Sequence, residues 1–442
     1  MLFRQFVDDD LGCASYLIGD EDSEEAVVVD PAYAIEQYLQ QAERDGVRIV
    51  RVLETHTHAD HVSGHGRFAL DHDLPVSIHA AAGPQYPFDA LADGDSVELG
   101  PVAIRVIHTP GHRPEHCAFA VVDRERGDEP WLTLTGDSLF VGDAARPDLA
   151  SEAAEGARGL YQSLRRLLEL HDGVEVYPGH VSGSLCGSGM SSKASSTIGF
   201  ERRFNHKVGM GDEDEFVADA IRTGVRPANM DRIVELNRGP FLRSPTPLEP
   251  LDGGGAGAIL DVRAAEEFAA GHARGAVNVP LDGGSFPTKA GFVLPLDDRV
   301  LVHVATAEHA QRAAQGLRAV GIFDLAGYVL GPPSDERLAP VELDELRSLV
   351  ASGEVEVLDV REPHERDQGY IPGSRNIPYR LVREWAEDLQ GGKPVVTICS
   401  SGPRAGVAAS VLAAAGVDAR PVLHGGVPDW DGETVSFRRC GS

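Results

Sequence analysis

The stretch VRIVRVLETHTHADH, residues 47–61, decides the fold of the first part of this chain. Its beginning is rich in Val, Ile and Leu, which predicts a β-strand over residues 47–54. The strand runs into a dense group of metal-binding side chain types, namely His56, His58, Asp60 and His61. Imidazole and carboxylate groups are the usual ligands of Zn, Fe and Mn. A loop at the end of a strand can direct alternating side chains at one point, so the stretch predicts a metal site.

Further candidate ligands follow other apolar runs. His112 comes after VAIRVIH, Asp137 ends LTLTGD, and His180 ends VEVYPGH. A single histidine is most often an ordinary core or surface residue, but a whole set that follows predicted strands points to one shared site. Asp30, at the end of VVVD, is interpreted either as a support for this site or as a turn residue before Pro31.

The motifs THTHADH, HTPGH, TGD and YPGH resemble the metallo-β-lactamase superfamily over residues 1–250. The resemblance implies an αββα sandwich with its metal site at one edge. Two branches of the superfamily remain open. Glyoxalase II-like thioester hydrolases bind two zinc ions, whose ligands map onto His56, His58, His112 and Asp137 for the first ion, and onto Asp60, His61, Asp137 and His180 for the second. Persulfide dioxygenases bind one Fe(II) per chain, through a triad that maps onto His56, His112 and Asp137.

Three features of the sequence favour the dioxygenase branch, and the third is the sulfur-transfer part of the chain described below, for which a thioester hydrolase has no evident use. The run GDSLFVGDAARPDLA, which contains Asp137, resembles the dioxygenase pattern and has Arg146 at the arginine position. The last motif reads YPGH, where the hydrolases usually have CGHEY. Two histidines and one carboxylate leave three positions open for O₂ and a thiolate-type substrate. In this branch the remaining polar residues orient ligands and bound water, namely His58, Asp60, His61 and His180.

A cationic segment lies at residues 191–207, where Lys and Arg outnumber the single Glu although the chain as a whole has a net charge of −29. It is interpreted either as a solvated helix start or as a site for the carboxylates of a thiol carrier. Lys193 and Arg146 are the candidate substrate contacts. Cys186, in SGSLCGSG, is a candidate for a redox or substrate-proximal role.

The second half of the chain contains an internal repeat. Residues 243–258 are dense in Pro and Gly and predict a linker. Beyond it, LDVRAAEEFAAGHARGAVNVP (260–280) aligns with LDVREPHERDQGYIPGSRNIP (358–378). Each copy alternates predicted strands and helices, which predicts two small parallel α/β domains. The predicted domains are residues 1–250, 251–337 and 338–442.

The last copy carries a candidate nucleophile. In VVTICSSGPRAGVAASVLAAAG (395–416) a cysteine lies between a strand and a helix, where loop and helix N–H groups and Arg404 favour the thiolate. With LHGGVPDW, this copy resembles a rhodanese domain, and the family's persulfide-forming residue maps onto Cys399. The six-residue loop suits sulfur rather than phosphate and comprises Cys399, Ser400, Ser401, Gly402, Pro403 and Arg404. The middle copy has Val304 and His309 at the two key positions, so we expect it to be silent.

The composition limits the class of protein, its partners and its cellular compartment. Hydrophobic residues make up 42% and charged residues 25%, as in ordinary globular proteins. The net charge of −29 argues against nucleic acid and anionic membrane partners. Five cysteines do not make a disulfide framework, and the N-terminus lacks a signal-peptide pattern, so we expect a cytoplasmic protein.

Taken together, these features predict an α/β multidomain enzyme of sulfide detoxification, a persulfide dioxygenase fused to a sulfurtransferase. The first reaction is R–S–SH + O₂ + H₂O → R–SH + sulfite + 2 H⁺, and Cys399 then exchanges sulfane sulfur with sulfite or thiosulfate. A low-molecular-weight thiol persulfide is the expected partner, and the sequence leaves a homo-oligomer open. Two alternatives stay open: a binuclear zinc thioester hydrolase and a non-catalytic sulfane-sulfur carrier.

Overall fold

The computed structural model describes residues 1–147, 152–181, 191, 193–221, 229–253, 257–295 and 297–436. Residues Met1–Pro245 form most of one compact unit and the later residues most of a second, and each unit is considered by itself. None of the described helices is long and apolar enough to cross a membrane. The three predicted domain limits stay a prediction.

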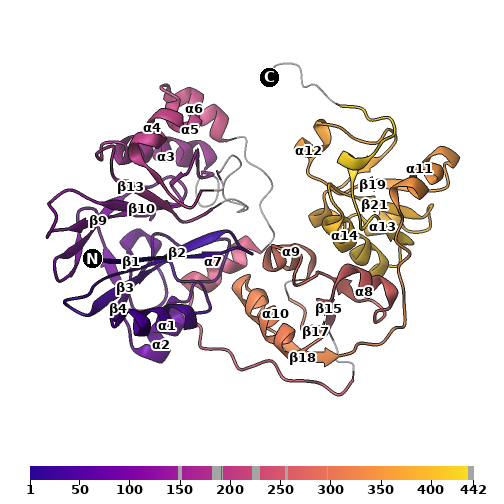
Figure 1. Ribbon diagram of the computed structural model, residues 1–442, viewed down its shortest axis with the longest axis horizontal. Coiled ribbons are helices and arrows are strands. Elements are labelled where there is room, and N and C mark those ends of the chain that lie inside the picture. Colours follow the sequence, from indigo (N-terminus) through magenta and orange to yellow (C-terminus); the bar gives the residue numbers. More distant parts are fainter. Residues whose placement is uncertain are drawn as a thin grey trace. The chain divides into compact units, whose positions relative to one another are not determined.

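The first unit is built on two mixed six-stranded sheets within the described residues (Figure 1). The first sheet has the order β1-β2-β3-β4-β5-β6, with strands at Leu2–Asp8, Cys13–Asp20, Glu25–Val29, Arg48–Leu53, Val76–His79 and Asp89–Leu91. The second has the order β14-β13-β10-β9-β8-β7, with strands at Ser196–Thr197, Glu175–Pro178, Leu132–Gly136, Cys117–Asp123, Val102–His108 and Ser96–Leu99. A small β11–β12 hairpin adds Leu139–Phe140 and Asp143–Ala144.

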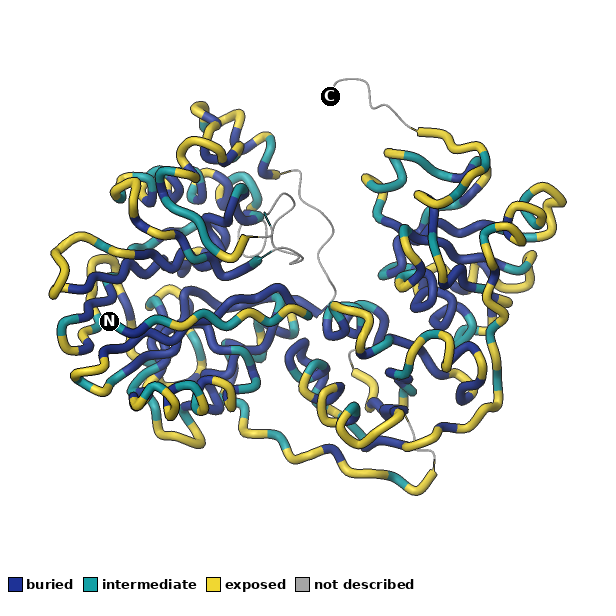
Figure 2. Tube along the Cα trace, viewed as in Figure 1, coloured by how far each residue is buried: buried dark blue, intermediate teal, exposed yellow. Residues whose placement is uncertain are grey.

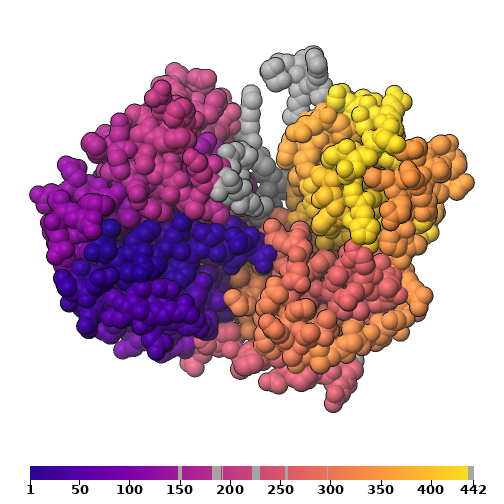
Figure 3. Space-filling model, viewed as in Figure 1, coloured from indigo at the N-terminus to yellow at the C-terminus, as the bar shows by residue number. Residues whose placement is uncertain are grey.

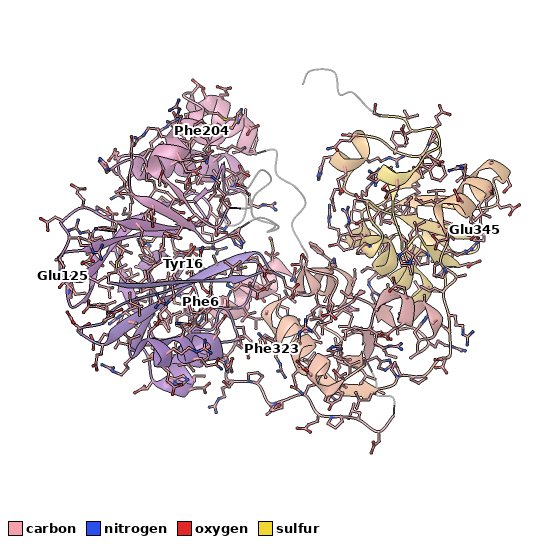
Figure 4. The ribbon with its side chains drawn as sticks, viewed as in Figure 1. Phe6, Tyr16, Glu125, Phe204, Phe323 and Glu345 are labelled. Atoms are coloured by element: carbon pink, nitrogen blue, oxygen red, sulfur yellow. The ribbon has the colours of Figure 1, made fainter. Side chains whose placement is uncertain are left out.

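Apolar side chains explain the layering of this unit. Strands β2 and β9 are buried along their whole length, as expected for strands covered on both faces (Figure 2). The core between the sheets includes Ile18, Val29, Phe119 and Leu134. Tyr16, labelled in Figure 4, spans this core and donates its hydroxyl to the Pro178 carbonyl at 2.5 Å.

Helices cover the outer faces of both sheets. Helices α1 (Glu36–Asp45) and α2 (His65–His72) pack on the first sheet, and α3 (Ala153–Leu167) and α6 (Glu213–Ala220) pack on the second. In Figure 3 the indigo and magenta atoms of this unit form one continuous surface. This arrangement is the predicted αββα sandwich, so the predicted fold class is confirmed. The unit also contains α4 (Ile198–Phe204), α5 (His206–Gly209) and α7 (Met230–Arg238).

The second unit contains two similar four-stranded parallel sheets. The first has the order β16-β15-β17-β18, with strands at Val277–Asn278, Ala258–Asp261, Val300–Val304 and Leu325–Leu330. The second repeats that order as β20-β19-β21-β22, with strands at Arg375–Asn376, Glu356–Asp359, Val395–Ile398 and Ala419–Pro421. The helices are α8 (Ala265–Ala270), α9 (Phe286–Val293), α10 (Ala307–Ala319), α11 (Leu343–Ser352), α12 (Pro363–Asp367), α13 (Ala386–Leu389) and α14 (Pro403–Ala414). The predicted pair of parallel α/β domains is therefore confirmed.

Candidate metal centre and sulfur-transfer loop

The metal motif begins where β4 ends at Leu53. Asp30, at the end of the neighbouring β3, has a positive φ of 51° and fixes the start of the motif. One of its carboxylate oxygens accepts the Thr55 N–H at 2.7 Å, and the other accepts the Thr55 hydroxyl at 2.8 Å. Asp30 therefore holds the motif in place, as the first of its two interpretations predicted.

The structure brings together the three residues of the predicted iron triad. His112 Nε2 lies 3.5 Å from Asp137 Oδ2, and His56 Nε2 lies 4.0 Å from the same oxygen. One donor atom from each residue lies within 4.8 Å of the others, and all three side chains are buried. His56 Nε2 and both Asp137 oxygens have no hydrogen-bond partner. Buried polar atoms without partners are costly, so the donor set fits a divalent metal ion.

Neighbouring groups hold the outer nitrogens of these rings. The Thr55 hydroxyl lies 2.9 Å from His56 Nδ1, and the Arg146 carbonyl lies 3.0 Å from His112 Nδ1. Such contacts fix the ring orientation and leave Nε2 free for a metal. Burial lowers the pKa of both His56 and His112, which keeps the rings neutral. Arg146, predicted as a substrate contact, therefore supports the centre through its backbone.

Three more predicted residues lie beside the triad, namely Asp60, His61 and His180. His180 Nε2 lies 3.2 Å from Asp137 Oδ2 and 3.4 Å from Asp60 Oδ2. His61 Nδ1 lies 3.2 Å from the same Asp60 oxygen. Burial raises the pKa of Asp137, but His180 and His112 outweigh it, and the pKa lies well below its usual range. Cys13 also lies beside Asp60 and His61, and the sequence analysis did not single it out for this site.

His58 belongs to a different polar group. Its Nε2 lies 3.3 Å from Asp30 Oδ1 and 3.2 Å from Glu54 Oε2, and neither of its ring nitrogens has a hydrogen-bond partner of good geometry. Burial lowers the pKa of His58, but the two carboxylates raise it well above its usual value. Glu54 also accepts hydrogen bonds from Ser63 and His65. Sequence reasoning missed Glu54, although it is the residue directly before the motif.

The sulfur-transfer loop connects β21 to α14. Cys399 is buried, and the Gly402 N–H donates to its Sγ at 3.1 Å. Gly402 has a φ of +106°, and a Cβ placed there would lie 1.9 Å from the Leu423 carbonyl oxygen. Only glycine fits this position, which lets the loop fold around the sulfur. The loop residues Ser401 and Pro403 are exposed.

The Arg404 guanidinium is paired with a carboxylate. Its two terminal nitrogens donate to Glu365 of α12 at 2.6 and 2.7 Å, and the Ser400 hydroxyl donates to Glu365 at 3.1 Å. Burial would raise the pKa of Glu365, but the hydrogen bonds from Arg404 lower it to about 2. The predicted cation of the loop is therefore partly balanced by a counter-charge that the sequence pattern did not indicate.

The middle copy lacks this arrangement. Its strand β17 ends at Val304, and α10 follows with His309 in its first turn. Neither residue is a sulfur nucleophile or a permanent cation, so the expectation of a silent copy stays a prediction supported by these positions.

The predicted carrier contact Lys193 lies on the surface. Its Nζ lies 4.9 Å from the centre of the exposed Phe200 ring on α4. Arg203 lies in the same way over Phe204, which is labelled in Figure 4. These contacts do not connect the segment to the metal triad. Cys186 lies outside the described residues.

Comparisons with known proteins agree with this architecture. Residues 8–180 match the family model described as metallo-beta-lactamase superfamily, and residues 246–331 and 342–433 match that of the rhodanese-like domain. An uncharacterized protein of Mycobacterium leprae, ML0493, is 30% identical over 233 residues, which cover 46% of this chain and 97% of that protein. The chain belongs to the metallo-β-lactamase superfamily, and two rhodanese-like domains follow that domain.

Two further relatives bear the name of a particular enzyme. Persulfide dioxygenase ETHE1, mitochondrial, from Bos taurus is 29% identical over 241 residues, which cover 54% of this chain and 87% of that protein. The Homo sapiens protein of the same name is 28% identical over 256 residues, covering 56% and 91%. A solved metallo-beta-lactamase structure from Staphylococcus aureus has a TM-score of 0.69 and 29% identity, and covers 75% of this chain and 98% of that one.

Proposed function

We propose that the first domain is a non-heme iron persulfide dioxygenase that converts a low-molecular-weight thiol persulfide to sulfite. The homology to persulfide dioxygenases and the rhodanese-like domains supports an enzyme of sulfur metabolism. The observation that carries the proposal is the buried triad of His56, His112 and Asp137, in which His56 Nε2 and both Asp137 oxygens have no hydrogen-bond partner. Two imidazoles and one carboxylate form the ligand set of Fe(II) oxygenases.

Bound iron would supply the redox chemistry and the Lewis acidity for O₂ and the persulfide sulfur. The protein holds the ligands ready for this task, because Thr55 and the Arg146 carbonyl fix the two imidazole rings. His180 contacts both Asp137 and Asp60, and so it links the triad to a second polar group. The burial of the triad excludes bulk water and strengthens the electrostatic interactions within the site.

We propose that the last domain is a sulfurtransferase. Cys399 takes the outer sulfur of a persulfide: R–S–SH + Cys–SH → R–SH + Cys–S–SH. Sulfite then attacks that sulfur and forms thiosulfate, and the Cys399 thiolate leaves: Cys–S–S⁻ + SO₃²⁻ → Cys–S⁻ + S₂O₃²⁻. The Gly402 N–H lies 3.1 Å from Sγ, so it donates to the charged sulfur of the free Cys399 thiolate, which is the leaving group when sulfite attacks the outer sulfur.

Metal analysis of protein purified without added metal tests the first proposal. We expect about one iron per chain, O₂ uptake with glutathione persulfide, and loss of both in His112→Ala. His72→Ala is the matched control, because His72 is an exposed residue of α2. Full iron retention in His112→Ala would contradict the triad. About two zinc ions per chain, with thioester hydrolysis, would favour the hydrolase instead.

A further inference from the structure

Helix α7 carries a polar side chain on its buried face. Its buried residues Met230, Ile233 and Asn237 recur at spacings of three and four, which places them on one side of the helix. An apolar residue is expected at such a position, yet Asn237 stands there and is only 4% exposed. A buried amide is costly unless its hydrogen bonds are made inside the protein. The partners of Asn237 therefore indicate what the residue does.

The Asn237 side chain is hydrogen-bonded to the backbone between β4 and α2, residues 54–64, which we call the metal-motif loop. Its Nδ2 donates to the His61 carbonyl at 2.8 Å and to the His58 carbonyl at 3.0 Å, and its Oδ1 accepts the Ser63 N–H at 2.9 Å. The opposite orientation of the amide would direct its oxygen at two carbonyl oxygens, so these roles are fixed. One side chain thus uses both its donors and its acceptor on the metal-motif loop.

The metal-motif loop has a second anchor at its start. There Asp30 accepts hydrogen bonds from the N–H and the hydroxyl of Thr55 at 2.7 and 2.8 Å. His56, the triad residue that this loop supplies, follows directly, and the residues held by Asn237 begin two positions later. The backbone that carries His56 is therefore fixed on both sides of that residue.

Such anchoring matters for metal binding because a ligand that is already in place does not have to be ordered when the ion binds. Without the amide of Asn237, two carbonyl groups and one N–H of the metal-motif loop would lose their partner. Buried groups of this kind are expensive to leave unpaired, so the loop would shift to satisfy them. The shift would reach His56 through the backbone, although Asn237 does not touch the imidazole.

We propose that Asn237 is a positioning residue of the metal centre, which holds the metal-motif loop and thereby directs His56 toward the triad before the ion binds. The proposal rests on the iron triad proposed above and adds a residue to the support of that site. Asn237 lies outside residues 8–180, which match the metallo-beta-lactamase superfamily model, so the motifs of the family do not assign it. It belongs to the same compact unit as the loop.

Hydrogen exchange of the metal-free, full-length protein tests the clamp without any assay of activity. In the parent protein we expect the amides of residues 58–64 to exchange slowly although no ion is bound. Asn237→Ala and Asn237→Leu should both speed this exchange roughly tenfold or more, because Leu restores the volume of the side chain but not its hydrogen bonds. Ile233→Val is the matched control, since it reduces the packing of the same buried face of α7 without removing the amide. It should leave the exchange of the loop unchanged.

Anaerobic titration of the same proteins with Fe²⁺ gives the second measurement. Asn237→Ala should raise the dissociation constant of iron roughly tenfold, as the loss of a group that orients a ligand does, while O₂ uptake per bound iron stays near the parent rate.

Three results would overturn the proposal: rapid exchange of the loop in the metal-free parent, equal behaviour of Asn237→Ala and Ile233→Val, or an Asn237→Ala protein that is less stable but binds iron as the parent does. Full iron retention in His112→Ala would instead contradict the triad, and the exchange comparison would still report on the clamp. The two failures are therefore distinguishable.

Discussion

Replacing Glu365 by Gln tests how the sulfur-transfer loop is held. Glu365 accepts two hydrogen bonds from Arg404 and one from Ser400, and its side chain is 25% exposed. Gln has nearly the same shape but no charge, and it offers an NH₂ group where one carboxylate oxygen accepted. The substitution therefore removes the ion pair with little change in packing.

The pKa of Glu365 sets the size of the effect. Burial raises this pKa, but hydrogen bonds from Arg404 outweigh burial and lower it from 4.5 to about 2. A shift of that size corresponds to at most ~3.4 kcal/mol. Because both side chains are about a quarter exposed, solvent screening reduces the contribution to about 1–2 kcal/mol. Since the folded-state pKa is lowered, this stabilisation is present above pH 4.5 and is lost as the pH falls toward 2.

Denaturant unfolding and sulfurtransferase kinetics of the full-length protein check this prediction. At pH 7, Glu365→Gln should lower the free energy of unfolding of the last domain by about 1–2 kcal/mol, and the difference should shrink below pH 4.5. Release of the Arg404 charge should lower the KM for thiosulfate roughly fivefold, which corresponds to about 1 kcal/mol of anion binding.

The matched control is Glu345→Gln, because Glu345, labelled in Figure 4, pairs with Arg420 at 2.6 Å outside the loop. It should leave the KM unchanged. An unchanged unfolding free energy in Glu365→Gln would refute the ion-pair reasoning. A normal KM with reduced stability would show that Arg404 does not face the sulfur donor.

Two further predictions concern the same loop. Cys399→Ser in the full-length protein should abolish thiosulfate:cyanide sulfurtransferase activity. It should leave O₂ uptake at the parent rate, with sulfite replacing thiosulfate as the product. Remaining transferase activity would mean that the middle copy, with Val304 at the nucleophile position, is active. Gly402→Ala should destabilise the loop by about 2 kcal/mol or more, because the new Cβ meets the Leu423 carbonyl at 1.9 Å and φ is +106°. A Gly402→Ala protein with parent stability and activity would contradict that geometry.

The sequence is sufficient to predict that His56, His112 and Asp137 lie together, because all three follow predicted strands. His56, His112 and Asp137 come from three separate strand ends, and the two sheets of the sandwich bring these ends together. Cys13 gave no such signal, since it begins β2 and precedes no motif. Its place beside Asp60 and His61 depends on the pairing of its backbone with that of His180, a contact between distant segments that no local pattern encodes.

The electrostatics of the second unit were also only partly predictable. Arg404 was identified as the cation of the loop from its spacing to Cys399. Its partner, Glu365, lies on α12, well before the loop in sequence, and a charged residue in a short helix has many equally ordinary explanations. The two side chains come within hydrogen-bond distance only in the folded domain, where β19 pairs with β21 and α12 lies beside the loop.

A comparison of the two rhodanese-like copies distinguishes the contacts that maintain the fold from the residues expected to carry out sulfur transfer. In the middle copy Arg263 donates to Asp261 at 2.6 Å and to the Gly271 carbonyl at 2.9 Å. The last copy repeats these contacts between the equivalent residues, with both distances at 2.7 Å. Asn278 and Asn376 likewise each bridge two carbonyls of their own copy, at 2.9 and 2.8 Å.

These shared contacts join β15 to β16 and β19 to β20, so they stabilise the sheet in both copies. Among the residues that differ between the copies are the cysteine and the arginine of the loop, which take no part in those contacts. The middle copy thus keeps these contacts of the last copy, and it has Val304 and His309 at the positions of the cysteine and the arginine of the loop. We therefore expect the middle copy to serve packing or spacing rather than sulfur transfer, and a fragment of that copy with thiosulfate:cyanide sulfurtransferase activity would contradict this expectation.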